Sequence, residues 1–551
     1  MNQARSLLIL SSGQVSRNLV GELGPISTSN IPLPGGLFLD GLLNQTTKSY
    51  ERVYCTLDQS KAELGRILEA KYQNLTVHYG DFRLSIAEAL LVFLNSLSDE
   101  ISLLDVVYGD TFSTSLFVDS SESDLIFIAN SDGSDEWDHV ERDKNGQLAF
   151  SNQNLEIQDF CMTGGFRIAD PQAFIQALDE SISNQKENVG SGRNSRDFHR
   201  ALSIYETKRK KPFHLQLDLS WKDLGHRRTY FKQRRIYISN GTRVFNSLDF
   251  DLKAGWVTKG GQEDKIIAEL NWFATIPNSL KHYVPNVKKL ESLDKYAIQY
   301  IPSIPLNEHW ISENPNKDFW IDLVASVDDM LKDFSVHSEA LPAEELKRLK
   351  TSVYIEKVID RYTDVQELIR KTQDEDKSGL SALNLESLTS TATERVLKAG
   401  EVVSGLGNWS VIHGDLCLSN IIYDQITDNP KLIDPRGAFG KIGIFGDPVY
   451  EMLKLSQCVL GDYDYLAANL YSVRSYSGEI QLDLPRTKEH DWLKSMFKEY
   501  LSDKLVEFGL DYNTFRTLEA GLFLSASPLH NESDRWLALI LQANTILREI
   551  E

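Results

Sequence analysis

The pattern of apolar segments changes near residue 245 of this 551-residue chain. Before that point, short apolar or β-branched runs alternate with segments of helical periodicity. Such alternation is typical of an α/β domain with a mainly parallel sheet. After that point the pattern is largely helical, apart from an initial strand-rich segment and a β-rich island at Ser410–Ile433. At roughly 100–200 residues per domain, we expect two domains, residues 1–245 and residues 246–551.

The period of the apolar residues predicts the individual elements of both parts. In the first part we expect strands at Leu7–Leu10, Val53–Leu57, Leu75–Tyr79, Ile101–Tyr108, Leu125–Ala129 and Phe213–Leu219. We expect helices there at Gln59–Tyr72, Ile86–Ser96 and Pro171–Ser183, and a loop at Ser183–Asp197. In the second part we expect strands at Arg243–Leu252, Gly255–Lys259 and Tyr296–Tyr300, and a helix at Gln262–Thr275. Helical periodicity with charged outer faces follows at Glu344–Gln373 and Asp491–Glu551.

The charge and the apolar content argue against several classes of protein. The 58 Lys and Arg residues and 79 Asp and Glu residues give a formal net charge of −21, whereas a general nucleic-acid binder has a basic surface. No apolar run approaches the roughly 20 residues that a membrane span needs. The four cysteines form no CxxC pair, which favours reduced, buried thiols in a cytoplasmic protein. Whether the chain forms a homo-oligomer stays open.

The β-rich island contains the chemically most informative residues. His413-Gly414-Asp415 is followed by Asn420 and then, at the end of the next apolar run, by Asp434. Phosphoryl transfer needs a carboxylate beside the attacking hydroxyl, and oxygen ligands that hold Mg²⁺ against the nucleotide phosphates. An Asp, a nearby Asn and a second Asp after a strand meet that need. A β-hairpin with ordinary polar turns is the alternative interpretation.

These residues resemble those of the aminoglycoside phosphotransferase and choline kinase family, small-molecule kinases with an α+β, protein-kinase-like fold. The resemblance implies that Asp415 is the catalytic base and that ATP is the phosphoryl donor. It also implies that Asn420 and Asp434 bind Mg²⁺ and that His413 supports the loop. The segment Gly446–Glu451 is typical of the family as well, and its acidic residues there brace the catalytic loop.

A kinase also needs a cation on the nucleotide phosphates, held by a glutamate on a helix. Lys259 ends an expected strand and Glu269 lies in the helix that follows, so these two residues are the best pair. Lys253 or Lys265 could replace Lys259, and a surface lysine with a solvated helix charge is the alternative interpretation. Residues Gln299-Tyr300-Ile301 would then form the hinge that contacts adenine, through Gln299 and Ile301.

The first part of the chain has carboxylates after two expected strands. Asp110 follows the strand that ends at Tyr108, and Asp223 lies in Trp221-Lys222-Asp223-Leu224-Gly225. Open α/β sheets bind ligands at the carboxyl ends of their strands, and two carboxylates can share one Mg²⁺ and steady a pyrophosphate leaving group. Together with Gly164–Ile168, these motifs resemble the sugar-phosphate nucleotidyltransferases, which have a Rossmann-like GT-A fold. The resemblance implies a metal at Asp110 and Asp223 and a nucleoside triphosphate substrate, with CTP and GTP as candidates.

The nucleotide-binding loop departs from the pattern of that family. Its members open with a glycine-rich loop that contains an arginine, followed by a Lys-Pro segment. In this chain Gly13 and Arg17 are the candidate nucleotide-binding residues, and Asn30-Ile31-Pro32 stands where the lysine is expected. Arg17 could take the place of that lysine. A degenerate domain that binds substrate or serves as a scaffold is the alternative to nucleotidyl transfer.

Two functions remain open from the sequence. In the first, the second domain phosphorylates a sugar or small alcohol, and the first domain couples the resulting phosphate to a nucleotide. The segment Arg227–Asn246, which links the two halves, combined with the kinase motifs resembles two-domain proteins of bacterial capsule and surface-polysaccharide synthesis. In the second, the chain is a kinase for choline or another amino alcohol, with a first domain that only binds or assembles. An aromatic cage for a quaternary ammonium could then come from four tryptophans, which core positions would explain equally well: Trp256, Trp272, Trp310 and Trp320.

Overall fold

The computed structural model describes residues 5–81, 83–97, 101–115, 122–131, 137–151, 160–183, 196–241, 247–374, 385–424, 427–476, 479–530 and 534–551. The chain divides into two compact units, each with its own core. Unit 1 comprises Met1–Leu33 and Leu37–Arg234, and unit 2 comprises Pro34–Gly36 and Arg235–Glu551. The expected domain boundary between residues 245 and 246 lies outside the described residues, as does most of the expected loop at Ser183–Asp197.

A nine-stranded mixed sheet forms the centre of unit 1. Four strands run parallel in the order β6-β1-β4-β5: β6 (Leu103–Tyr108), β1 (Arg5–Leu10), β4 (Arg52–Asp58) and β5 (Leu75–Gly80). The rest of the sheet comprises β8 (Leu125–Asn130), β9 (His139–Arg142), β10 (Leu148–Ser151), β11 (Phe160–Ile168) and β12 (His214–Leu217). The central strand β1 contains a continuous apolar run because both faces of the sheet are covered there, and Leu7, Leu8 and Ile9 are fully buried.

The expectation of a mainly parallel sheet is wrong for the half that contains β11. This strand runs antiparallel to β6 on one side and to β8 on the other, with Phe166 opposite both Val106 and Ile126. The described chain between β8 and β11 forms the hairpin β9–β10, and not the crossover helix that a parallel pairing needs. The domain is therefore α/β, as predicted, but its sheet is mixed.

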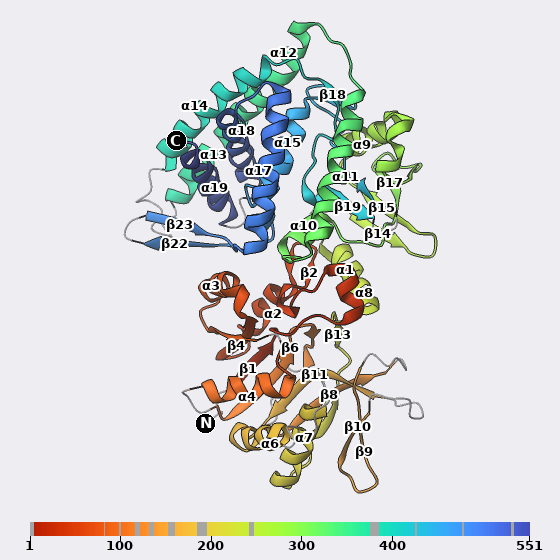
Figure 1. The fold of residues 1–551 in the computed structure, drawn as a ribbon, viewed down its shortest axis with the longest axis vertical. Helices are drawn as coiled ribbons and strands as arrows, with labels where there is room; N and C mark the ends of the chain where they lie inside the picture. Colours follow the sequence, from red (N-terminus) through yellow and green to blue (C-terminus); the bar gives the residue numbers. More distant parts are fainter. Residues whose placement is uncertain are drawn as a thin grey trace. The chain divides into compact units, whose positions relative to one another are not determined.

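Helices cover the sheet of unit 1 on both sides (Figure 1). On one side are α4 (Ile86–Ser96), α6 (Pro171–Ser183) and α7 (Arg196–Arg209), and on the other are α2 (Phe38–Thr46) and α3 (Ala62–Lys71). The bounds of α4 and α6 are those that the sequence predicts. The buried core under α4, α6 and α7 includes Leu8, Leu90, Phe166, Phe174, Phe198 and Tyr205. Shorter elements are α1 (Arg17–Leu23), β2 (Pro32–Leu33), β3 (Gly36–Leu37), β7 (Thr111–Phe112) and β13 (Lys222–Asp223).

Unit 2 begins with a four-stranded antiparallel sheet in the order β14-β15-β17-β16. The strands are β14 (Ser247–Asp251), β15 (Trp256–Gly260), β16 (Val287–Lys289) and β17 (Lys295–Gln299), and α9 (Glu263–Thr275) connects β15 to the next part of the sheet. These elements match the expected strands and helix to within a few residues. The segment before them, which was expected to link the two halves of the chain, contains the helix α8 (Arg227–Gly241).

The remainder of unit 2 is largely helical, and Figure 1 shows its helical bundle beside the small sheet. Its helices are α10 (Leu306–Ile311), α11 (Lys317–Val336), α12 (Ala343–Thr351), α13 (Lys357–Asp374), α14 (Leu385–Ser404), α15 (Pro448–Val459), α16 (Tyr463–Ala467), α17 (Lys488–Phe508), α18 (Tyr512–Ala526) and α19 (Arg535–Glu549). Short strand pairs are β18 (Ser410–Val411) with β21 (Phe445–Gly446), β19 (Ile421–Asp424) with β20 (Asn429–Leu432), and β22 (Ser472–Tyr476) with β23 (Glu479–Asp483). Within the described residues, no helix has the length and apolar content needed to cross a membrane.

Candidate functional site

Lys259 of unit 2 lies between two carboxylates from different elements. It is near the end of β15, its side chain is almost fully buried, and its Nζ is 2.8 Å from Glu269 Oε2 on α9. The same Nζ is 2.9 Å from Oδ1 of Asp434, which follows β20. The phenol of Tyr296 on β17 donates to the carboxylate of Glu269 at 2.8 Å. Three predicted site residues that are distant in sequence are therefore in direct contact.

The charges in this cluster support one another. Burial acts to lower the pKa of Lys259, but the carboxylates of Asp434 and Glu269 hold this pKa above its usual value. Burial raises the pKa of Glu269, and Lys259 opposes this rise. The other two candidate lysines, Lys253 and Lys265, are exposed. Lys259 is therefore the one lysine among these three that lies in the cluster.

The loop between β18 and β19 holds Asp415 and Asn420 together. Asn420 ends the 3₁₀ turn Leu418–Asn420, and its Nδ2 donates to the main-chain carbonyl of Asp415 at 2.8 Å and to the carboxylate at 3.3 Å. The Nε2 of His413 donates to the carbonyl of Ile433 at 2.9 Å. Because Ile433 directly precedes Asp434, this bond ties the loop to the carboxylate that contacts Lys259.

Two buried acidic residues of α15 and its N-cap brace the loop. The Glu451 carboxylate accepts from the main-chain N–H groups of His413 and Gly414, both at 2.8 Å. Burial raises the pKa of Glu451 to about 7, against the effect of these two hydrogen bonds. Asp447 caps α15 by accepting from Val449 N, and it forms an ion pair of 2.9 Å with the fully buried Lys350. Loss of either carboxylate would leave buried donors without partners, at a cost on the order of 1–3 kcal/mol.

The turn after Asp434 brings that residue close to α9. Asp434 has a φ of +57° and Gly437 a φ of +66°. A Cβ on Gly437 would overlap the main-chain carbonyl of Ala268 in α9. Only a glycine fits both this approach and the left-handed conformation. The glycine therefore allows Asp434 to lie beside Lys259 and Glu269.

The donor set near Asp434 fits a magnesium ion that is shared with a nucleotide. In the described part of the chain, no three His, Cys, Asp or Glu side chains lie close enough to hold a metal alone. Magnesium in phosphoryl-transfer sites uses only one or two protein carboxylates, together with phosphate oxygens and water. The Asp434 carboxylate is 43% exposed, and the hydrogen bonds of Asn420 to Asp415 use its nitrogen and not its carbonyl oxygen.

The two hinge candidates lie at and after the end of β17. Gln299 is exposed; its main-chain N–H donates to the Asn286 carbonyl at 2.8 Å, and its side chain accepts from Asn286 Nδ2 at 2.8 Å. Ile301 is half-buried, and its carbonyl accepts from Ser303 N. The side-chain oxygen and main-chain N–H of Gln299 and the carbonyl of Ile301 are thus already hydrogen-bonded within the fold.

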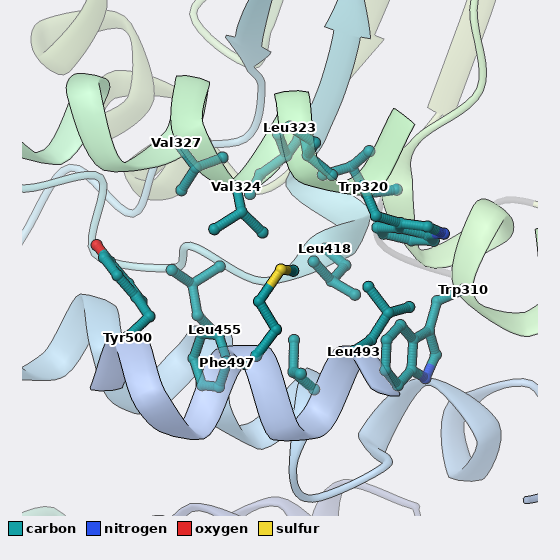
Figure 2. Close-up of a pocket in the computed structure, with 14 residues that line it drawn as sticks. Trp310, Trp320, Leu323, Val324, Val327, Leu418, Leu455, Leu493, Phe497 and Tyr500 are labelled. Carbon is teal, nitrogen blue, oxygen red and sulfur yellow. The ribbon is translucent and has the colours of Figure 1, made fainter. Parts of the chain in front are cut away.

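The four tryptophans of the possible aromatic cage lie in three separate places. Trp256 packs against Lys288, whose Nζ is 3.7 Å from the ring centroid, and Trp272 is buried and donates to the Ile412 carbonyl at 2.7 Å. Trp310 and Trp320 line an apolar cavity of about 60 Å³ between α11, α15 and α17 (Figure 2). The remaining lining side chains labelled in Figure 2 are aliphatic or aromatic, and the hydroxyl of the one tyrosine among them, Tyr500, donates to Asp328 at 3.0 Å.

In unit 1, Asp110 and Asp223 lie next to each other beside the short pair β7–β13. Thr111 pairs with Asp223, the carbonyl of Asp110 accepts from Leu224 N at 2.9 Å, and a Cβ on Gly225 would overlap the Asp110 carboxylate. Burial raises the pKa of Asp110 to about 6, and the charge of Asp223 adds to the rise. A carboxylate whose ionisation is disfavoured by burial and by a neighbouring carboxylate suits a divalent cation, which would relieve the repulsion.

The loop with Gly13 and Arg17 lies next to these carboxylates. The Gly13 carbonyl accepts from Thr28 N at 2.7 Å, and Gly13 and Arg17 are both exposed. Ser16 Oγ donates to the carbonyl of Gly225, two residues after Asp223. The exposed Arg17 at the start of α1 is therefore placed near the Asp110–Asp223 pair.

Several residues of the two sites were not predicted. In unit 1, His226 Nδ1 is 2.9 Å from Asp223, and the ring centroid of Trp137 lies 5.6 Å from that of His226 and 5.4 Å from that of Trp221. Because His226 lies only three residues after Asp223, the sequence could have indicated that it belongs to the site. Trp137 is distant in sequence from the other site residues, and no local pattern indicates it. In unit 2, Lys454 Nζ is 3.1 Å from Asp415 Oδ1. Its position three residues after Glu451, on the same helix face, could have indicated it.

Comparisons with known proteins find matches among solved structures. No family model and no curated protein matches this sequence. A nucleoside-diphosphate-sugar pyrophosphorylase from Vibrio cholerae RC9 is 13% identical, with a TM-score of 0.34 over 41% of this chain and 99% of that one. An inositol-1-phosphate CTP transferase from T. maritima is 11% identical, with a TM-score of 0.33 over 44% of this chain and 99% of that one.

A CTP:phosphocholine cytidylyltransferase from Streptococcus pneumoniae is 9% identical, with a TM-score of 0.33 over 42% of this chain and 99% of that one. The likeness concerns the N-terminal ~40% of the chain.

Proposed function

We propose that unit 2 is an ATP-dependent phosphotransferase with a protein-kinase-like fold that acts on a hydroxyl group of a small molecule. The observation that carries this proposal is the contact of Lys259 with both Glu269 and Asp434, at 2.8 and 2.9 Å. A lysine on a strand, held by a helix glutamate beside a metal-binding carboxylate, is the arrangement that phosphoryl transfer from ATP requires. The adjoining loop supplies Asp415 as the base, and a hydrogen bond joins Asp415 to Asn420 in the same loop.

Each residue has a distinct role in this proposal. Asp415 orients the acceptor hydroxyl and takes its proton as the new O–P bond forms and the bond to ADP breaks. Lys259 neutralises nucleotide phosphates, and Glu269 keeps it in position. Asp434 and Asn420 would hold Mg²⁺, which supplies positive charge to the phosphates. His413 and Glu451 are positioning residues, since both act through the loop backbone.

We further propose that unit 1 transfers a nucleotidyl group onto the phosphate made by unit 2. The adjacency of Asp110 and Asp223 at the sheet edge supports this, because a shared Mg²⁺ would steady the departing pyrophosphate. The exposed Arg17 and the loop at Gly13 are the candidates for contact with the triphosphate. The two reactions form a natural order, since the product of the first is the substrate of the second. A role in surface-polysaccharide synthesis rests on the sequence resemblance alone.

The phosphotransferase proposal is tested by ADP formation from Mg-ATP with a panel of sugars, polyols, hydroxy acids and amino alcohols. We expect ADP formation with at least one acceptor class, and its loss in Asp415→Asn with a fall in turnover of about 10²-fold or more. Mg-ATP binding by Asp415→Asn should stay near the wild-type value. The matched control is Asp249→Asn, which changes an exposed carboxylate on β14. Normal turnover by Asp415→Asn would show that Asp415 is not the base.

A further inference from the structure

A second group of cations lies beside Asp415, separate from Lys259. Lys454 of α15 forms an ion pair with the Asp415 carboxylate at 3.1 Å. Arg436 packs against the loop: a Cβ on Gly414 would be only 2.9 Å from the Arg436 Cβ. The guanidinium donates to the Tyr450 hydroxyl at 3.2 Å and lies 5.5 Å from the centroid of that ring. Two cationic side chains therefore flank the proposed base.

Lys357 adds a third positive charge to this group. It is the first residue of α13, one helical turn after Tyr354, whose ring centroid is 6.0 Å from that of Tyr450. Tyr450 acts to raise the pKa of Lys357, but burial and the cations Arg436 and Lys454 lower it below its usual value. The same three cations hold the pKa of Tyr450 below its usual value despite burial. Arg436 thus lies against the Tyr450 ring, and Lys357 and Lys454 are close enough to interact electrostatically with Tyr450 and with each other.

The carboxylates near this group do not balance its charge. Asp415 is paired with Lys454, and Glu451 is occupied by two main-chain N–H groups. Asp464 also interacts with Lys454, but burial raises the pKa of Asp464 to about 7. Within the described part of the chain, neither Lys357 nor Arg436 forms an ion pair with a carboxylate. Partly buried cations without counter-charge are costly unless an anion completes the site. This local excess is the more notable because the whole chain carries a formal charge of −21.

We propose that the phosphoryl acceptor of unit 2 is an anion, a hydroxyl compound with a carboxylate or phosphate group bound by Lys357, Arg436 and Lys454. This inference rests on the proposed phosphotransferase function and narrows its substrate class. Arg and Lys are the side chains that recognise such groups, and arginine does so with two parallel hydrogen bonds. An acceptor held beside the Tyr450 ring would present its hydroxyl to Asp415. A cationic acceptor such as choline would meet three positive charges.

Anion binding is tested first without turnover. The wild-type chain with saturating Mg-ADP is titrated with inorganic phosphate and with D-glycerate by calorimetry. We expect binding that weakens about tenfold in Lys357→Ala and is unchanged in Lys347→Ala, an exposed lysine on the neighbouring helix α12. If neither anion binds, or if both variants bind alike, the proposed anion site does not exist. Phosphate binding without glycerate binding identifies a phosphate as the recognised group, and the reverse result identifies a carboxylate.

Turnover then separates failure of this inference from failure of the proposed function. ADP formation is compared for D-glycerate, glucose 6-phosphate, glucose and choline. We expect anionic acceptors to be used with the higher kcat/KM, and Lys357→Ala to raise the KM for the acceptor about tenfold while leaving the KM for ATP unchanged. Preference for glucose or choline would overturn the anionic acceptor while the phosphotransferase stands, as would a change in the KM for ATP alone. Absence of ADP with every acceptor would instead overturn the phosphotransferase.

Discussion

The Lys259 cluster is the point at which single residues decide the proposed chemistry. Its members come from a strand, a helix and a loop. Both carboxylates, of Glu269 and Asp434, are close enough to form an ion pair with Lys259. Type and order of the residues were sufficient to predict Lys259, Glu269 and Asp434 as members of one site. Lys357 and Trp137 could not be predicted, because their proximity to the sites arises only from tertiary packing. The catalytic and metal-binding roles stay predictions.

Asp434 should matter more than Asn420 for binding of Mg-ATP. Asp434→Ala removes the proposed charged ligand and one partner of Lys259, whereas Asn420→Ala removes a proposed neutral ligand. We expect Asp434→Ala to weaken Mg-ATP binding by at least about tenfold and Asn420→Ala to weaken it less, as measured by calorimetric titration. Asp249→Ala, at an exposed position on β14, is the control. Wild-type affinity in Asp434→Ala would contradict the metal assignment.

Asp110 gives a pH-dependent prediction for unit 1. Its pKa in the folded chain is about 6, above the ~3.9 of an unfolded aspartate. Ionised Asp110 therefore destabilises the fold above pH 6, and this destabilisation disappears as the pH falls from 6 to about 4. Asp110→Asn should then raise the free energy of unfolding at pH 8, on the order of 1–3 kcal/mol, and raise it less at pH 5.

Denaturant unfolding at the two pH values measures this difference. Asp179→Asn, which changes an exposed carboxylate on α6, should show no such dependence. An equal effect of Asp110→Asn at both pH values would mean that Asp110 ionises normally. Addition of Mg²⁺ at pH 8 should stabilise the wild-type chain more than Asp110→Asn if the carboxylate pair holds the metal.

At the scale of elements, the contact between the turn after Asp434 and α9 shapes the site. Gly437→Ala adds a methyl group that overlaps the Ala268 carbonyl, and it also places alanine at a φ of +66°. Gly509→Ala is a matched control, because Gly509 has a φ of +71° and open space around its Cα. Both variants should lose about 1 kcal/mol or more of stability from the strained backbone.

Gly437→Ala should lose more stability than the control, and it alone should weaken Mg-ATP binding, because α9 carries Glu269. Equilibrium unfolding and calorimetric titration of both variants provide the comparison. If the two variants behave alike, the approach of the turn to α9 does not position the cluster.

The sequence predicts elements well where local pattern and packing agree. The capping box at Ser85 and Glu88 marks the start of α4, and its end follows from the apolar period. The helix α8 was missed because Arg227–Gly241 is dominated by charged and polar residues, and its packing against the fold depends on a few side chains such as Tyr230. The antiparallel direction of β11 depends on pairing partners that lie elsewhere in the chain, which no local pattern contains.

At the scale of the whole molecule, the two candidate sites belong to units with separate cores. A change in one site should therefore leave the other active, because the site residues described for each function belong to one unit. Asp223→Ala should abolish pyrophosphate release and leave ADP formation unchanged. Asp415→Asn should abolish ADP formation and leave unit 1 able to use an acceptor that is already phosphorylated.

The most direct test follows ADP and pyrophosphate together in one reaction. The reaction contains the acceptor found in the panel and ATP, either alone or together with CTP or GTP. The account predicts that the wild type forms ADP first and then pyrophosphate. Asp415→Asn should form neither product from the unphosphorylated acceptor, and pyrophosphate alone once the phosphorylated acceptor is supplied. Asp223→Ala should form ADP alone. Pyrophosphate release by Asp415→Asn from the unphosphorylated acceptor, or no pyrophosphate from wild type while ADP accumulates, would contradict a chain whose two units act in sequence.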